Sequence, residues 1–336
     1  MSEKKFGDIY SKIKNYGLIP VIKPEGVNES VKLAEALASG GMNVAEIAFT
    51  AKSELKSAES AESVKKISAA FPDMLIIAGN VENPEHAKSA VESGAKAVFA
   101  SESSESGDNG EVISYCLKNN IAVIPECSDA KNIEKALGMG LDVVKFFPAE
   151  KSGGLEHLKE LSGKYPNVRF IPAGGITEDS FLDYLSEKSV IACCGSFMLK
   201  EEHINKNDFE KIKESAILII QKMLGFDLAH LVINCDNAEQ ADRDSSKIES
   251  IFGLKKTDAG LSVANADILH FMKQRSYGKN GQIAICTNFI DRAVFYLKEA
   301  KKEFIDESAR FDADGNLSSI YLDNIIGGFA FKLVRK

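Results

Sequence analysis

The sequence predicts a (β/α)₈ barrel, a cylinder of eight parallel strands ringed by helices, followed by a smaller α+β domain. Eight short apolar segments alternate with helical patterns between residues 18 and 194. Successive segments begin roughly 20–30 residues apart, the length of a strand, a crossover helix and two loops. The chain of 336 residues also suffices for two domains of ~150 residues. We therefore expect the barrel in residues 1–220 and the second domain in residues 225–336.

The predicted barrel strands are rich in β-branched and aromatic residues. They are 18–23, 43–49, 74–79, 96–100, 121–125, 142–146, 168–172 and 189–194. Between them, Gly40-Gly41 ends one helical pattern and Asn83-Pro84 opens another. Eight parallel strands are the number that closes a barrel. An open doubly wound sheet is the alternative, but it usually has fewer strands, and no GxGxxG turn follows the first strand here.

Charge and composition exclude several classes of function. Lys+Arg number 41 and Asp+Glu 49, a formal net charge of −8, so neither a phosphate backbone nor an anionic lipid surface attracts the protein. No apolar stretch approaches ~18 residues, and residues 1–10 are too polar for a signal peptide. The six cysteines show no CxxC spacing. We expect a cytoplasmic protein with neither a nucleic-acid nor a membrane partner.

Two charged side chains are predicted to point into the barrel. Side chains alternate along a strand, so Glu46 lies on the face opposite Ile47, and Lys145 on the face opposite Phe146. Burial disfavours an ammonium group and lowers a lysine's pKa, and a neutral amine can attack a carbonyl to form a Schiff base. We interpret Lys145 as such a lysine, with Glu46 as its partner. The alternative is a structural ion pair that fills the barrel.

Glycines follow the last two predicted strands. Gly174 and Gly175 come after the seventh strand, and Ser196 comes after a glycine at the end of the eighth. Glycine lets backbone N–H groups approach an anion, and barrels often bind phosphate at these two positions. We therefore predict a phosphate site at these three residues, although a tight turn alone would also explain the glycines. Phe147 shares the face of Lys145 and is predicted to contact the substrate.

Four segments resemble the KDPG/KHG aldolase family, and the resemblance covers about residues 6–215. The segment 140–150 (GLDVVKFFPAE), which runs on to Gly153-Gly154, looks like the family's lysine signature. Residues 169–176 (RFIPAGGI) resemble its phosphate loop. Residues 195–198 (GSFM) resemble its last strand end, and residues 19–22 (IPVI) its opening strand.

This resemblance implies a metal-independent class I aldolase that needs no cofactor. Such an enzyme cleaves 2-keto-3-deoxy-6-phosphogluconate, a phosphorylated keto acid, to pyruvate and glyceraldehyde 3-phosphate. Lys145 would form the Schiff base with the C2 ketone, and Glu46 would act as general acid and base. The family also implies a homotrimer. Another phosphate-binding barrel, similar to thiamine-phosphate synthase, would need an acidic metal cluster that the sequence does not contain.

Three positions depart from the family's pattern. Thr50 stands where the family motif Glu-(Val/Ile)-Thr-(Leu/Phe)-Arg has its carboxylate-binding arginine, and Asn80 replaces its carboxylate-binding threonine. Ser101 follows the fourth strand where a Ser-Pro-Gly turn is expected. We expect these residues to contact the substrate, but losing the arginine should cost about 1–3 kcal/mol of binding. The prediction is an altered substrate preference or, alternatively, an impaired protein that only binds phosphate or sugar acids.

The last hundred residues predict a different fold. After an amphipathic helix at 211–224, a βαβββ pattern appears twice, with strands at 226–235 and 282–287, helices at 238–252 and 290–300, and a last strand at 328–335. This pattern resembles the vicinal-oxygen-chelate (glyoxalase-like) fold. The metal-ligand positions of that fold correspond to His230, His270, Gln282 and Lys332. A protonated lysine repels a cation, so we predict no metal and a packing or assembly role.

Overall fold

A computed structural model describes residues 2–49, 54–102 and 108–336. The chain divides into two compact units, Met1–Ile220 and Gln221–Lys336, and each contains one eight-stranded sheet. None of the helices in these three ranges is long and apolar enough to cross a bilayer.

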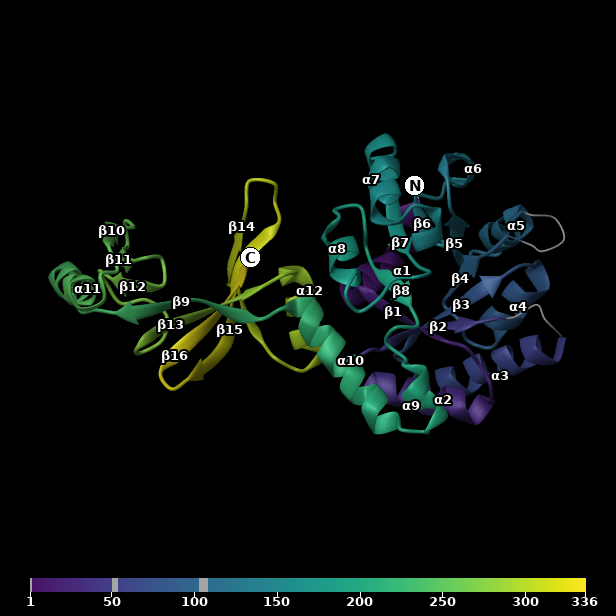
Figure 1. Cartoon of the computed structure of the whole chain (residues 1–336), viewed down its shortest axis with the longest axis horizontal. Coiled ribbons are helices and arrows are strands. Elements are labelled where there is room, and N and C mark those ends of the chain that lie inside the picture. Colours follow the sequence, from purple (N-terminus) through teal and green to yellow (C-terminus); the bar gives the residue numbers. More distant parts are fainter. Residues whose placement is uncertain (1, 50–53, 103–107) are drawn as a thin grey trace. The chain divides into compact units, whose positions relative to one another are not determined.

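The first unit is a nearly closed parallel barrel, so the predicted barrel is confirmed (Figure 1). Its strands are β1 (Leu18–Ile22), β2 (Val44–Ala48), β3 (Leu75–Val81), β4 (Ala97–Ala100), β5 (Ala122–Cys127), β6 (Val143–Phe146), β7 (Arg169–Pro172) and β8 (Cys193–Gly195). They follow the order β7-β6-β5-β4-β3-β2-β1-β8. Isolated pairs of Phe170 with Val190 and of Ala173 with Cys194 join the two ends of this sheet.

Helices surround the strands of the barrel (Figure 1). They are α1 (Ser2–Tyr16), α2 (Val27–Ser39), α3 (Glu54–Ala70), α4 (Pro84–Glu92), α5 (Gly110–Lys118), α6 (Ala130–Gly138), η1 (Glu150–Ser152), α7 (Gly154–Lys164), α8 (Phe181–Ser186), α9 (Glu201–Asn205) and α10 (Phe209–Leu224). The start of α4 agrees with its sequence signal: Asn83 Oδ1 accepts a hydrogen bond from the His86 N–H at 2.8 Å, and Pro84 is the first helical residue.

Most strand boundaries differ from the prediction by one or two residues; β5, for example, continues past Pro125 to Cys127. The differences at β8 and β3 have a visible local cause. The eighth strand is only Cys193–Gly195, because the Val190 N–H bonds back to the Glu187 carbonyl in a turn. The third strand continues past Gly79 to Val81, with Asn80 at a φ of 56°. Both differences arise at the edges of apolar runs, where local hydrogen bonds decide the boundary.

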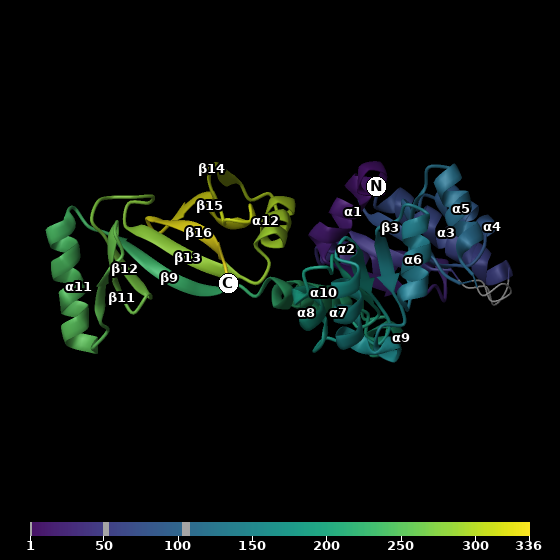
Figure 2. The same ribbon diagram turned by 90° about the horizontal axis from the view of Figure 1, so that it is seen from above.

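The second unit contains two consecutive β-α-β-β-β segments. Its elements are β9 (Asp227–Asn234), α11 (Ala238–Phe252), β10 (Lys256–Asp258), β11 (Ser262–Asn265), β12 (Leu269–Met272), β13 (Gly281–Thr287), α12 (Ile290–Glu299), β14 (Phe304–Phe311), β15 (Leu317–Ile326) and β16 (Phe329–Arg335). Their order in the sheet is β10-β11-β12-β9-β13-β16-β15-β14. Strands β9 and β13 pair antiparallel and join the two halves (Figure 2).

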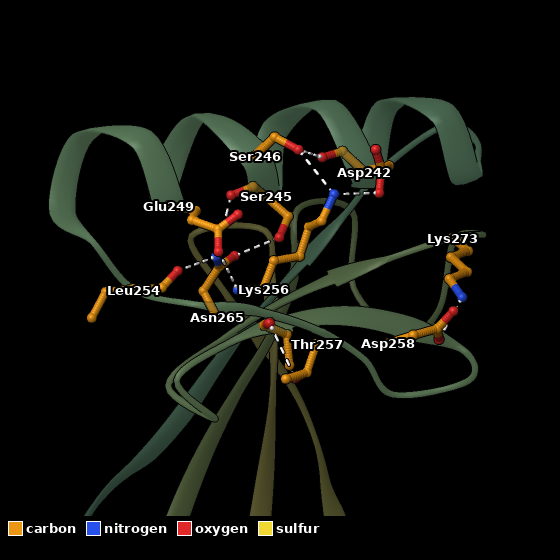
Figure 3. Close-up of polar contacts among 11 residues, drawn as sticks. Asp242, Ser245, Ser246, Glu249, Leu254, Lys256, Thr257, Asp258, Asn265 and Lys273 are labelled. Atoms are coloured by element: carbon orange, nitrogen blue, oxygen red, sulfur yellow. Dashed lines mark hydrogen bonds and ion pairs between the residues drawn. The ribbon is translucent and has the colours of Figure 1, made fainter.

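Helix α11 covers one face of β11 and β12. Val263 and Phe271 pack in a core beneath this helix, while the alternate residues Ala264 and His270 lie on the other face of the sheet. Asn265 fixes the helix to the sheet: it accepts a hydrogen bond from Ser245 Oγ at 2.7 Å and donates one to the Leu254 carbonyl at 2.8 Å (Figure 3). The face that carries His270 is therefore the one without α11.

Candidate active site

Lys145 and Glu46 meet inside the barrel. Lys145 comes from β6 and Glu46 from β2, and the lysine Nζ lies 3.1 Å from each of the two carboxylate oxygens. Their side chains are 5% and 4% exposed, respectively. The two residues that alternation directs inward are thus in direct contact, although 99 positions separate them in the chain.

A second carboxylate, which sequence reasoning missed, also contacts the lysine. Glu126 of β5 is in register with Lys145 on the neighbouring strand, and its Oε1 lies 3.1 Å from Nζ. The ring centroid of Phe99 lies 4.4 Å from Nζ. The available signal was an acidic residue near the end of an apolar strand. Lys145 therefore sits between two acids over an aromatic ring.

The electrostatic balance at Lys145 differs from the prediction. Burial lowers the pKa of Lys145, but the charges of Glu46 and Glu126 raise it, and the net pKa lies above the ordinary value. The expectation of a lowered pKa is therefore wrong for this arrangement, because it did not include the two carboxylates. The ammonium is the resting form, and it must lose a proton before the amine can attack a carbonyl.

Two neighbours besides the lysine determine the position of the Glu46 carboxylate: one donates a hydrogen bond to it and the other leaves space for it. The Cys194 thiol donates a hydrogen bond to Glu46 Oε2 at 2.9 Å. Burial raises the pKa of Cys194 and the Glu46 charge raises it further, so the thiol keeps its proton and acts as a donor. On β3, a Cβ atom at Gly79 would overlap Glu46 Oε1, so glycine is needed there to admit the carboxylate.

A cavity of about 620 Å³ opens above this centre. Its lining includes Lys23, Glu25, Lys56, Phe147, Gly174, Gly175 and Ser196. The predicted phosphate-binding residues thus border the same cavity as Lys145. Gly174 and Gly175 have φ values of 88° and 90°, and a Cβ atom at Gly175 would lie 2.6 Å from Glu150 Cγ. Backbone conformation and packing therefore require glycine here, and phosphate binding stays a prediction.

The remaining predicted contacts occupy different places. Asn80 lines the 620 Å³ cavity, and its Nδ2 donates to the Phe49 carbonyl at 2.9 Å. Ser101 instead lines an adjoining cavity of about 260 Å³, which shares Asn80, Glu126 and Phe147 with the first. Its buried Oγ has no hydrogen-bond partner in the part of the chain that the structure describes. Thr50 lies outside the described residues.

The chemical groups of this centre are those of an enzyme that forms a Schiff base on a lysine. Across the described ranges, no cluster of three or more His, Cys, Asp or Glu side chains could hold a metal ion. The centre offers a lysine, two carboxylates and a thiol at the mouth of a parallel barrel. A lysine beside a proton-transferring carboxylate is the arrangement that Schiff-base chemistry requires.

Comparison with known proteins identifies the family. Residues 9–215 match the family model described as KDPG and KHG aldolase. The 2-dehydro-3-deoxy-phosphogluconate aldolase of Treponema pallidum is 35% identical over 204 residues, covering 61% of this chain and 92% of that protein. The corresponding protein of Haemophilus influenzae is 34% identical, covering 61% and 91%. This chain therefore belongs to the KDPG and KHG aldolase family.

A solved structure agrees with this assignment. The KDPG aldolase from Legionella pneumophila, with pyruvate captured as a covalent carbinolamine intermediate, has a TM-score of 0.56 and 29% identity. The similarity covers 63% of this chain and 97% of that one.

Proposed function

We propose that the barrel is a class I aldolase that cleaves a 2-keto compound through a Schiff base on Lys145. The observation that carries the proposal is the buried Lys145 Nζ, held 3.1 Å from Glu46 beside a cavity of about 620 Å³. The relatives support it, because they are named as aldolases and the Legionella pneumophila enzyme holds pyruvate as a covalent carbinolamine.

Bond formation begins when the Lys145 ammonium gives a proton to an adjacent carboxylate. The free amine attacks the C2 carbonyl, and the resulting carbinolamine loses water to give an iminium ion. Glu46 lies against Nζ, so it can deliver the proton that leaves with this water.

Bond cleavage uses the iminium ion as an electron acceptor. Glu46 takes the proton of the C4 hydroxyl, C4 becomes the aldehyde carbonyl, and the electrons of the C3–C4 bond move toward the iminium nitrogen. The enamine that results is protonated at C3, and hydrolysis releases the keto product and free Lys145. Glu46 is the proposed general acid and base in the loss of water and in the cleavage of the C3–C4 bond.

The substrate class follows from charge. A phosphorylated 2-keto acid such as 2-keto-3-deoxy-6-phosphogluconate could place its phosphate at Gly174, Gly175 and Ser196. Near Lys145, however, Glu46 and Glu126 supply two negative charges against one positive charge. A substrate carboxylate beside them would be repelled. We therefore propose weak activity on that keto acid, or a preference for a keto compound without the α-carboxylate.

Borohydride trapping tests the Schiff base. The protein is incubated with pyruvate or with hydroxyacetone, which lacks the carboxylate, then reduced and measured by intact mass spectrometry. We expect a covalent adduct that Lys145→Ala abolishes. Lys131→Ala removes an exposed lysine from α6 and should leave the adduct unchanged. Absence of an adduct with both compounds in the wild-type protein would rule the proposal out.

The second candidate function is a protein that binds phosphate or sugar acids without turning them over. The raised pKa of Lys145 favours it, because an amine that keeps its proton does not attack a carbonyl. A steady-state assay with 2-keto-3-deoxy-6-phosphogluconate distinguishes the two: binding without pyruvate release supports the second candidate. From the family resemblance we also propose a homotrimer, which sedimentation velocity would test.

A further inference from the structure

One row of paired residues crosses four strands of the second sheet. Ala284 of β13 pairs with His230 of β9 on one side and with Lys332 of β16 on the other. Tyr321 of β15 pairs in turn with Lys332. Residues paired in this way point to the same face of a sheet. His230 and Lys332 therefore flank an alanine, with their Cα atoms about 10 Å apart across two strand spacings.

The neighbouring row of paired residues, two positions away along each strand, contains the small residue Ala330 and the polar residue Gln282. Gln282 of β13 pairs with Ala330 of β16 and with Val232 of β9, and Val232 pairs with His270 of β12. Ala284 and Ala330 are 0% and 4% exposed, so larger side chains stand around them. We call the set His230, His270, Gln282, Tyr321 and Lys332 the alanine-floored patch. Helix α11 lies on the opposite face of β11 and β12.

Contacts within the patch hold its walls in place. The Tyr321 hydroxyl donates to Gln282 Oε1, and the ring of Tyr277 stacks on Tyr321 with centroids 4.5 Å apart. The rings of His230 and His270 lie 4.9 Å apart. These contacts fix the aromatic, amide and imidazole groups around the two alanines.

Lys332 is a half-buried cation without a counter-ion. Its Nζ lies 5.5 Å from the ring centroid of Tyr321, and it forms no ion pair or hydrogen bond with the described residues. Burial lowers the pKa of Lys332, and the positive charge of Arg310 lowers it further. Burial also lowers the pKa of His230, as do the charges of His270 and Lys332. The potential in the patch is therefore positive, and an anion would offset it.

We propose that the alanine-floored patch is a binding site for a small anion that carries a carboxylate or phosphate group. The Lys332 ammonium supplies the charge, and the imidazoles of His230 and His270 supply N–H donors above the two buried alanines. A divalent metal ion is disfavoured at the same place, because Lys332 and Arg310 would repel it. This inference concerns the second unit and does not depend on the aldolase proposed for the barrel.

Fluorine NMR of the full chain labelled with 3-fluorotyrosine tests the proposal. The probes are inorganic phosphate and malonate, each titrated at constant ionic strength against chloride. Tyr277→Phe and Tyr321→Phe identify the two signals that report on the patch. Tyr184 reports separately on the barrel, because its hydroxyl donates to Glu150 beside Gly175. We expect a saturable shift of the Tyr277 and Tyr321 signals with at least one probe.

Substitutions at Lys332 connect the shift to the patch. Lys332→Met should weaken the response at least tenfold, and Lys332→Gln serves as a second variant without the charge. Lys332→Arg should retain binding. Lys247→Met removes an exposed charge from α11 in the same unit and should have no effect. If neither probe shifts the two signals saturably, or if the shifts survive in the Met and Gln variants, the proposal is overturned, whatever the barrel binds.

Discussion

Two opposing influences act on the proton of Lys145. Burial alone would release the proton, and the adjacent carboxylates of Glu46 and Glu126 retain it. Imine formation needs the neutral amine, so the fraction of reactive protein should increase with pH below the raised pKa of Lys145. Each carboxylate therefore has two effects: it can accept the lysine's proton, and it stabilises the unreactive ammonium.

Glu126→Gln is predicted to make Lys145 more reactive at neutral pH. The substitution removes one of the two charges that raise the lysine's pKa, so the pH profile of borohydride trapping should move to lower pH. A shift of about one pH unit gives a roughly tenfold faster trapping rate at pH 7. Glu126→Asp, which keeps the charge, is the control. Slower trapping at every pH would instead identify Glu126 as the acceptor of the lysine's proton.

Cys194→Ala is predicted to reduce turnover without changing substrate affinity. The thiol donates to Glu46 Oε2 at 2.9 Å, and a hydrogen bond of this kind contributes about 1 kcal/mol. We expect kcat to decrease about three- to tenfold, with KM nearly unchanged, because Glu46 loses a group that orients it. Cys194→Ser keeps a donor and should restore most of the activity. An equal loss in both variants would contradict a positioning role for the thiol.

At the scale of the strands, the alternation of side chains could be deduced from the sequence, but the register between neighbouring strands could not. The residues on the inward face of each strand could be predicted from the sequence, and Glu46 and Lys145 were among them. The contacts of Lys145 with Glu126 and Phe99 depend on the stagger of neighbouring strands in the barrel. Stagger is set by the closure of the whole sheet, so no local pattern contains it. The early end of the third predicted strand had a different, local cause: Asn80 adopts a left-handed conformation inside β3.

Gly79→Ala is predicted to displace the Glu46 carboxylate. The new methyl group on β3 would overlap the carboxylate, which can move only by leaving its position against Lys145. We expect turnover to decrease at least tenfold and the free energy of unfolding to decrease by about 1–3 kcal/mol. Gly138→Ala on α6, where no atom lies within 4 Å of the added Cβ, should leave turnover unchanged and should not lower the free energy of unfolding. Full activity of Gly79→Ala would show that the Glu46 position is not needed.

At the scale of the whole chain, the two units differ in how far the sequence could predict them. The barrel has motifs whose chemistry is visible in the sequence, and the family match covers residues 9–215. The second unit shows its β-α-β-β-β order in the hydrophobic pattern, but this pattern does not show that Arg310 also acts on Lys332 or that Tyr321 lies beside it. The resemblance to the vicinal-oxygen-chelate fold had grouped His230, Gln282 and Lys332 as ligand positions. Their pairing through Ala284 and Ala330 shows that they share one face of the sheet. The prediction of a packing module remains untested.

Separate cores predict separate unfolding transitions. Each unit buries its own apolar residues, among them Ile77 and Val144 in the barrel and Val263 and Phe271 in the second unit. A ligand stabilises only the unit that it binds, by about 2.7 kcal/mol at 100 times its dissociation constant. We therefore expect two calorimetric transitions. Pyruvate should raise the midpoint temperature of the barrel's transition only, by roughly 5 °C for a unit of this size. Lys145→Ala should remove that increase, and a single transition that moves as a whole would show that the two units unfold cooperatively.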